Sequence, residues 1–143
     1  MKSQEAEVYR KIQENTDTAI KALDTLSDKV YDDQLAMQIS SQSLKYSELH
    51  NRASKQLVAA KAESYRPNAL SELALRSGLH YNTLLNTSTG HIAELMIKSS
   101  NDSILKMEKS LNHNHEAGES CVELARQLIG LEEESIKRLK DYL

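Results

Sequence analysis

Helix-breaking residues and large aromatic residues are scarce in this chain. Its 143 residues include 1 Pro, 4 Gly, 6 Tyr and no Phe or Trp. So little Pro and Gly leaves few turns, and the runs of β-branched residues expected of strands are missing. The abundant residues, chiefly Ala, Leu, Lys, Glu, Gln and Ser, favour helix over sheet. The sequence therefore predicts an all-α protein, and its length fits one domain spanning residues 1–143.

Cysteine, long apolar runs and an excess of one charge are also lacking. The single cysteine, Cys121, excludes an internal disulfide, and we expect a reducing, cytoplasmic location. The N-terminal MKSQEAEVYR has no apolar stretch typical of a secretory signal, and no apolar run approaches the ~18 residues that span a membrane. With 18 basic and 21 acidic residues, the chain shows no basic patch for nucleic acid and no basic face for a membrane surface.

Apolar residues recur every three or four positions in four stretches of roughly 25 residues, which is the spacing of an amphipathic helix. Asp32 or Asp33 can cap the second stretch, and the cluster TST at 87–89 can cap the third. The second stretch ends near ESYRPN, and NHNHEAGES separates the third from the fourth. The apolar positions of the four stretches are Val8, Ile12, Ala19, Leu23, Leu26 and Val30; Leu35, Ile39, Tyr46, Leu49, Ala53, Leu57 and Ala60; Ile92, Leu95, Met96, Met107 and Leu111; and Cys121, Leu124, Ala125, Leu128, Leu131, Leu139 and Tyr142.

The connection between the second and third stretches is about 25 residues long, and we expect one or two short helices within it. Gly78 weakens the helix there. The connection is long enough to run the length of a bundle, whereas the other two connections are short and make antiparallel neighbours. The prediction is a ferritin-like four-helix bundle with a long, partly helical crossover, and a true fifth helix packed along the bundle would contradict it. One apolar face of the connection carries Leu70, Leu73, Ala74 and Ser77, and an apolar face resumes at Tyr81, Leu84 and Leu85.

The segment LLNTSTGHIAELMIKSSNDSILKMEKSLN, followed by LARQLIGLEEESIKRLKDYL, resembles a family of short, uncharacterised bacterial proteins. The resemblance covers most of the chain from about Tyr46 onward, and its closing helix has the pattern LA-x-x-L-x-x-x-E-E…L-K-x-Y-L. It implies a ferritin-like helix bundle and carries no known activity. Ferritin-like bundles commonly bind two metal ions between the helices, and the resemblance implies that these ions would be iron or manganese.

A conventional di-iron bundle needs a Glu from each of two helices and Glu-x-x-His from each of the other two. No Glu-x-x-His occurs in this chain, and Asn51 and Ser135 stand where the histidines would follow Glu48 and Glu132. At about 100° per residue, only Glu132 falls comfortably on an inward face. The candidate metal ligands, with Asp102 as an alternative to Glu94, are Glu132, Glu94, His91, Glu48 and Glu14.

His91 and Glu94 can share a metal in the order His-x-x-Glu, but the line through Ile92 and Leu95 leaves both at the edge of the buried face. We favour a boundary polar pair. In the NHNH segment at 112–115, His113 and His115 lie two positions apart, a spacing that can bind a transition metal weakly; we favour a polar turn between helices. Cys121 has acidic rather than basic neighbours, so we interpret it as a core residue.

Polar residues interrupt the apolar stripes near the middle of each predicted helix. Buried polar groups must find hydrogen-bond partners, so a polar layer can fix the register of the helices. Such a layer can also line a hydrated cavity or a ligand pocket. The residues of this predicted layer, in which Ser135 is accompanied by Glu132 on the same helix, are Asn15, Gln42, Ser99, Ser103 and Ser135.

The sequence contains no phosphate-binding loop and no intact catalytic constellation. Our leading hypothesis is therefore a non-enzymatic helical bundle that acts through its surface, as a homo-oligomer or a partner-binding module, with no cofactor. The alternative is a ferritin-like metal-binding or redox protein with an atypical site centred on Glu132.

Overall fold

The computed structural model describes all 143 residues, and it confirms the all-α prediction. There are five α-helices and no strand, and a short 3-10 turn, Lys140–Tyr142, follows the last helix. None of the helices has both the length and the apolar character needed to cross a membrane. The helices are α1 (Ser3–Ser27), α2 (Asp33–Ala59), α3 (Ala69–Thr83), α4 (Thr89–His113) and α5 (Glu119–Leu139).

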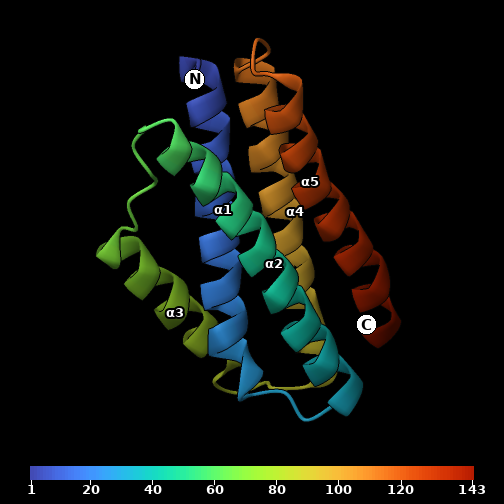
Figure 1. The fold of residues 1–143 in the computed structure, drawn as a ribbon. Coiled ribbons are helices and arrows are strands. Elements are labelled where there is room, and N and C mark those ends of the chain that lie inside the picture. Colours follow the sequence, from blue (N-terminus) through green and yellow to red (C-terminus); the bar gives the residue numbers. More distant parts are fainter.

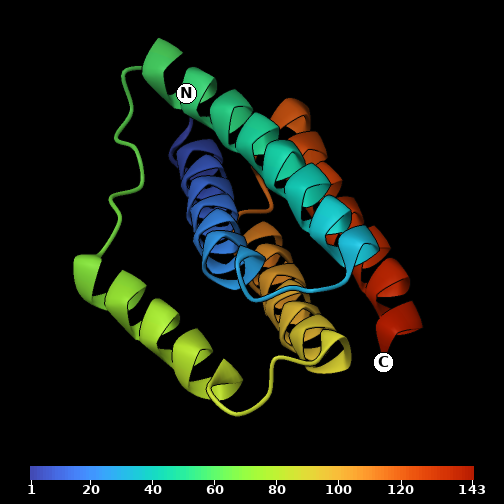
Figure 2. The ribbon, with the colours of Figure 1, turned by 90° about the horizontal axis from the view of Figure 1, so that it is seen from below.

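Four long helices, α1, α2, α4 and α5, lie side by side as a bundle (Figure 1). The hairpin of α1 and α2 and the hairpin of α4 and α5 are each antiparallel. The helices α2 and α4 run in the same direction, because the connection between them leads the chain back along the bundle before α4 begins (Figures 1 and 2). This connection contains α3, which lies outside the bundle on the side of α1.

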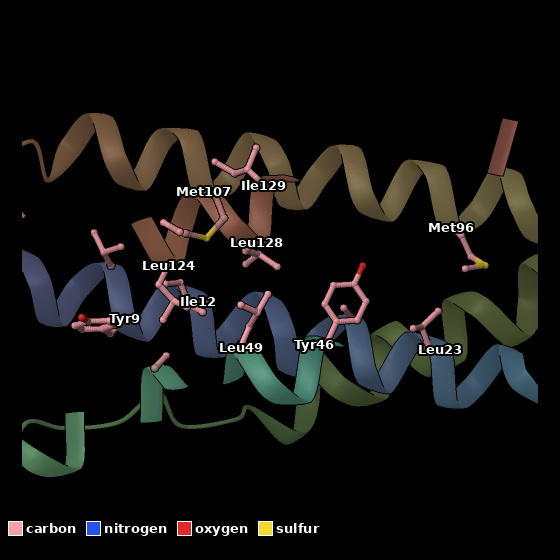
Figure 3. Close-up of a cluster of buried hydrophobic side chains, with 14 of the residues drawn as sticks. Tyr9, Ile12, Leu23, Tyr46, Leu49, Met96, Met107, Leu124, Leu128 and Ile129 are labelled. Atoms are coloured by element: carbon pink, nitrogen blue, oxygen red, sulfur yellow. The ribbon is translucent and has the colours of Figure 1, made fainter. Parts of the chain in front are cut away.

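The hydrophobic core is built by the four long helices alone. All 24 of its buried apolar residues belong to them, and the only buried residue of α3 is Thr83. Figure 3 shows how side chains from the two hairpins meet, with Ile12 of α1, Leu49 of α2, Met107 of α4 and Leu128 of α5 among them. The predicted apolar stripes supply 20 of the 24 core residues and miss Ala6, Tyr9, Ala93 and Ile129. Ala60, predicted on the stripe of the second helix, is exposed.

The helix starts follow the predicted capping residues. The carboxylate of Asp32 accepts a hydrogen bond from the backbone N–H of Leu35 at 2.9 Å, which satisfies a donor in the first turn of α2. The hydroxyl of Ser88 accepts from the backbone N–H of His91 at 3.3 Å and caps α4 in the same way. Both predicted capping sites are confirmed.

The second helix ends earlier than the sequence suggested, at Ala59 instead of near ESYRPN. Lys61 has a φ of 55°, in the left-handed region. Its N–H bonds to the carbonyl of Val58 at 3.0 Å, and the next N–H, of Ala62, bonds to the carbonyl of Leu57 at 2.9 Å. This pair of bonds is a Schellman motif, which satisfies the last carbonyls and turns the chain out of the helix.

The crossover contains one helix, α3, which continues through Gly78 without a break. Ion pairs hold it against α1. Glu72 of α3 bonds to Lys21 at 3.2 Å, and Arg76 of α3 bonds to Asp24 at 3.2 Å. The structure therefore has a fifth helix packed on the outside of α1, which is the feature named above as contrary to the predicted topology. A helical bundle is confirmed, but the four-helix, ferritin-like arrangement is not.

Gly130 lies in the interior of α5, and a Cβ built there meets no atom within 4 Å. We expect Gly130→Ala to raise the free energy of unfolding by about 0.5–1 kcal/mol, because alanine loses less backbone entropy in a helix. Chemical denaturation with urea measures the change. The matched variant Gly90→Ala should gain less, since its Cβ would lie 3.2 Å from the carbonyl oxygen of Tyr142. An equal gain at both positions would contradict this account of α5.

Candidate functional site: a buried polar cluster

Polar side chains from all four long helices meet inside the bundle. We call this group the polar cluster. Its members are buried, so each must be held by another member or by the backbone. Its residues are Asn15 of α1, Gln42 and Tyr46 of α2, Ser100 and Ser103 of α4, and Glu132 and Ser135 of α5.

Glu132 is the centre of the polar cluster and is only 2% exposed. Its Oε1 atom accepts hydrogen bonds from the hydroxyl of Tyr46 and, at 3.4 Å, from the hydroxyl of Ser100. The donors come from α2 and α4, and the acceptor comes from α5. One carboxyl group thus joins three of the four long helices.

Burial raises the pKa of the Glu132 carboxyl group, because the charged form loses its hydration. Hydrogen bonds from Tyr46, Ser103 and Ser100 oppose that change, and no basic side chain contributes to it. Burial, followed by the charge of Glu132 and the hydrogen bond to it, also raises the pKa of the Tyr46 hydroxyl. Both groups therefore hold their protons to higher pH than they would in water.

Two further pairs cross the bundle at the polar cluster. Gln42 donates from Nε2 to the hydroxyl of Ser135 at 2.6 Å, which joins α2 to α5. Asn15 donates from Nδ2 to the carbonyl oxygen and the hydroxyl of Ser103, at 3.1 and 3.2 Å, which joins α1 to α4. No buried side-chain nitrogen or oxygen lacks a partner. The hydrogen-bonding capacity of the cluster is thus used within the bundle, as a register function requires.

The structure places most of the predicted polar layer in the cluster and corrects one member. Asn15, Gln42, Ser103 and Ser135 are buried as expected. Ser99 is exposed, and the neighbouring Ser100 points inward instead. A helix advances 100° per residue, so an error of one position in the inward line exchanges these two serines.

Sequence reasoning placed Tyr46 on the apolar stripe and missed its role as a donor. The missing signal was a pairing between helices. A buried carboxyl group needs a donor, and Tyr46 carries the one phenol on the inward face of α2. Nothing in a single sequence states which helix lies opposite Glu132, so the pair appears only in the fold.

Of the candidate metal ligands, only Glu132 lies in the polar cluster. Glu14 forms an ion pair with Lys11 at 2.6 Å, and Glu94 forms one with Lys98 at 3.2 Å. Glu48 is exposed. No group of three or more His, Cys, Asp or Glu side chains lies close enough together to hold a metal ion.

His91 connects the start of α4 to the end of α3. One ring nitrogen lies 2.8 Å from the carbonyl oxygen of Asn82, and the other lies 3.7 Å from a carboxylate oxygen of Glu94. Asp102, the alternative to Glu94, is bonded to Lys106 at 3.0 Å. These positions agree with the interpretation of a boundary polar pair.

Cys121 is buried in the core, as predicted. Burial, with a smaller contribution from the charge of Glu5, raises the pKa of its thiol to about 12. A nucleophilic cysteine requires the opposite shift, because the thiolate is the reactive form. The thiol therefore acts as a small apolar side chain.

A small cavity of about 60 Å³ lies beside the polar cluster, between α1, α2, α3 and α4. Nine of its 12 lining residues are apolar, and Gln42, Ser99 and Ser100 are the polar ones at its edge. An engineered apolar cavity that accommodates benzene measures about 150 Å³. This cavity is well below that size.

No family model, characterised protein or solved structure matches this chain. The resemblance to a bacterial family of ferritin-like bundles stays a prediction.

We expect Glu132→Gln to change the dependence of stability on pH. Because the pKa of Glu132 is raised in the folded protein, the folded state holds its proton to higher pH than the unfolded chain. Stability therefore falls as the pH rises from the unfolded pKa through the folded pKa. Glutamine cannot ionise, so at neutral pH the variant should be more stable than the native chain, and its advantage should grow as the pH rises through that range.

Urea unfolding across a series of pH values measures this difference. The gain should disappear in acid, where Glu132 is protonated in both states. Glu133→Gln, at the exposed neighbouring position, is the control and should follow the native profile. A difference between Glu132→Gln and the native chain that does not vary with pH would contradict the assignment.

We expect Tyr46→Phe to lower the free energy of unfolding by about 1–3 kcal/mol, because Glu132 loses a buried donor. A double-mutant cycle with Glu132→Gln measures the coupling between the two side chains. The hydroxyl of the buried Tyr9 has only the thiol of Cys121 as a side-chain partner, so Tyr9→Phe should cost less. Additive effects of Tyr46→Phe and Glu132→Gln would show that the pair is not coupled.

Proposed function

We propose that this chain is a non-enzymatic helical interaction module that binds a helix of a polypeptide on the exposed side of α3. The observation that supports this function is a row of large apolar side chains along α3 that no part of the chain covers. We call this row the α3 outer face. Its large side chains are Leu70, Leu73, Tyr81 and Leu84, with the small Ser77 at its centre and Leu85 beside it.

The large apolar side chains of the α3 outer face are mostly exposed. Leu70 is 75% exposed, Tyr81 is 80% exposed and Leu84 is 74% exposed. The opposite side of the same helix faces the bundle, where Leu75 and Leu79 line the small cavity. Monomeric proteins rarely expose a contiguous apolar patch larger than a few hundred Å², and larger patches mark interaction sites.

The α3 outer face contains no charged residue. Residues 69–85 include only Glu72 and Arg76 as charged side chains, although Asp, Glu, Lys and Arg make up 27% of the chain. Both side chains reach toward α1, where they bind Lys21 and Asp24. Depletion of charge together with exposed leucine and tyrosine is the composition of the centre of a protein interface.

The polar cluster supports a structural role in place of a catalytic one. Its groups bond to one another and come from all four long helices. The order of these helices, two antiparallel hairpins joined by a long crossover, supports the further proposal of a ferritin-like arrangement.

The alternative function, a metal-binding or redox bundle with iron or manganese, has the buried carboxyl of Glu132 in its favour. It needs more ligands at that place, and Glu14, Glu48 and Glu94 would have to turn inward from positions on the outside of their helices. Elemental analysis of protein purified without a metal-affinity tag separates the two functions. About two iron or manganese ions per chain would favour the alternative.

Photo-crosslinking from position 81 tests the interaction module. We expect a photoreactive phenylalanine analogue in place of Tyr81 to form discrete adducts of higher mass in cells that naturally produce the chain. The same analogue in place of Tyr31 is a matched control, since Tyr31 is 83% exposed and lies outside α3. Adducts at neither position, or equally at both, would contradict the proposed function.

A further inference from the structure

We propose that the polypeptide bound to the α3 outer face is a second copy of this chain. In this dimer the two α3 helices pack antiparallel, with a two-fold axis at Ser77. The inference rests on the proposed function and names the partner at the same site.

The large side chains of the α3 outer face are spaced symmetrically about Ser77. In an antiparallel pair of identical helices, residues equally distant from the axis meet each other. Leu70 and Leu84 lie seven residues on either side of Ser77, and Leu73 and Tyr81 lie four residues on either side. At about 100° per residue, all of them fall within about 40° of the line through Ser77. Each large side chain therefore meets a large side chain of the other copy.

The residues at the centre of the face are small. Ser77 lies on the axis, and Ala74 lies about 60° from it around the helix. Small residues allow two helix axes to approach to about 8 Å, the short end of the usual packing range. The larger side chains at both ends can then interdigitate.

The α3 outer face also exposes a large area to solvent. The five large side chains of the α3 outer face and its edge are between 62% and 96% exposed. With roughly 200 Å² for each fully exposed residue, they present roughly 800 Å² per copy, which is the share of one partner in a standard interface. One copy therefore offers enough surface for a stable pair through α3 alone.

The charges favour an identical partner as well. The α3 outer face has no charged side chain with which to select an acidic or a basic partner, and its own helix charges are bound to α1. A second copy presents the same uncharged surface. No charge is buried when the two faces meet, so the dimer avoids the desolvation penalty of an unpaired ion.

Sedimentation equilibrium of the purified chain tests the dimer. We expect a mass of twice 16.1 kDa at micromolar concentration. Leu84→Glu should raise the dimer dissociation constant by roughly 100-fold, because each interface would then bury two unpaired carboxylates. Leu44→Glu is the matched control and should leave the dimer intact, since Leu44 is also 74% exposed but lies on α2.

Cysteine crosslinking tests the axis. In a Cys121→Ala background, Ser77→Cys should form a disulfide between copies, because the two-fold axis brings the residue against itself within the 4.4–6.8 Å that a disulfide requires. Ser71→Cys, on the same helix but about 120° away, should not.

A monomeric native chain would overturn the inference. So would a dimer that Leu84→Glu leaves intact, or one that crosslinks through position 71 and not through position 77. If the chain is monomeric while position 81 still yields an adduct with a different protein in cells, the interaction module stands and the second copy as its partner falls.

Discussion

A carboxyl group without a counter-charge, that of Glu132, sets the relative heights of the long helices. A buried carboxyl group must be hydrogen-bonded, so the donors Tyr46 of α2 and Ser100 of α4 have to lie at its level. The pairs from Gln42 and Asn15 cross the bundle at the same place. If one helix slipped by a turn, the buried partners would be left unsatisfied, at a cost of about 1–3 kcal/mol each. Apolar stripes alone impose no such penalty.

The four long helices supply every buried apolar residue of the core, and α3 adds only the partly buried Leu79 against it. It contributes a single buried residue, Thr83, and its charges hold it to the outside of α1. The buried polar groups of the interior bond to one another, whereas the α3 outer face is uncovered. This division is the reason that we place the function on the outside of the molecule.

Much of the fold could be predicted from the sequence. The spacing of apolar residues predicted the four long helices, and the capping side chains of Asp32 and Ser88 predicted where two of them begin. Facing arguments alone identified Glu132 as the inward carboxylate. These features depend on local periodicity and on hydrogen bonds within one turn, which a single sequence contains.

The rest depends on how helices meet. Ser100 is buried where Ser99 was predicted, because apolar periodicity locates the inward side of a helix only to within one residue. Tyr46 pairs with Glu132 across 86 positions, which no periodicity encodes. The helix α3 has leucines on two sides, and periodicity cannot decide which side packs on α1. The structure turns Leu75 and Leu79 inward and leaves Leu70 and Leu73 exposed.

Amide hydrogen exchange, measured at a series of protein concentrations, shows whether a second copy covers α3. If a second copy covers the α3 outer face, the amides of Ala69–Thr83 should exchange faster on dilution below the dimer dissociation constant. The amides of α5 should keep the same rates, because the core does not depend on the pair. Exchange in α3 that is fast and independent of concentration would contradict the account.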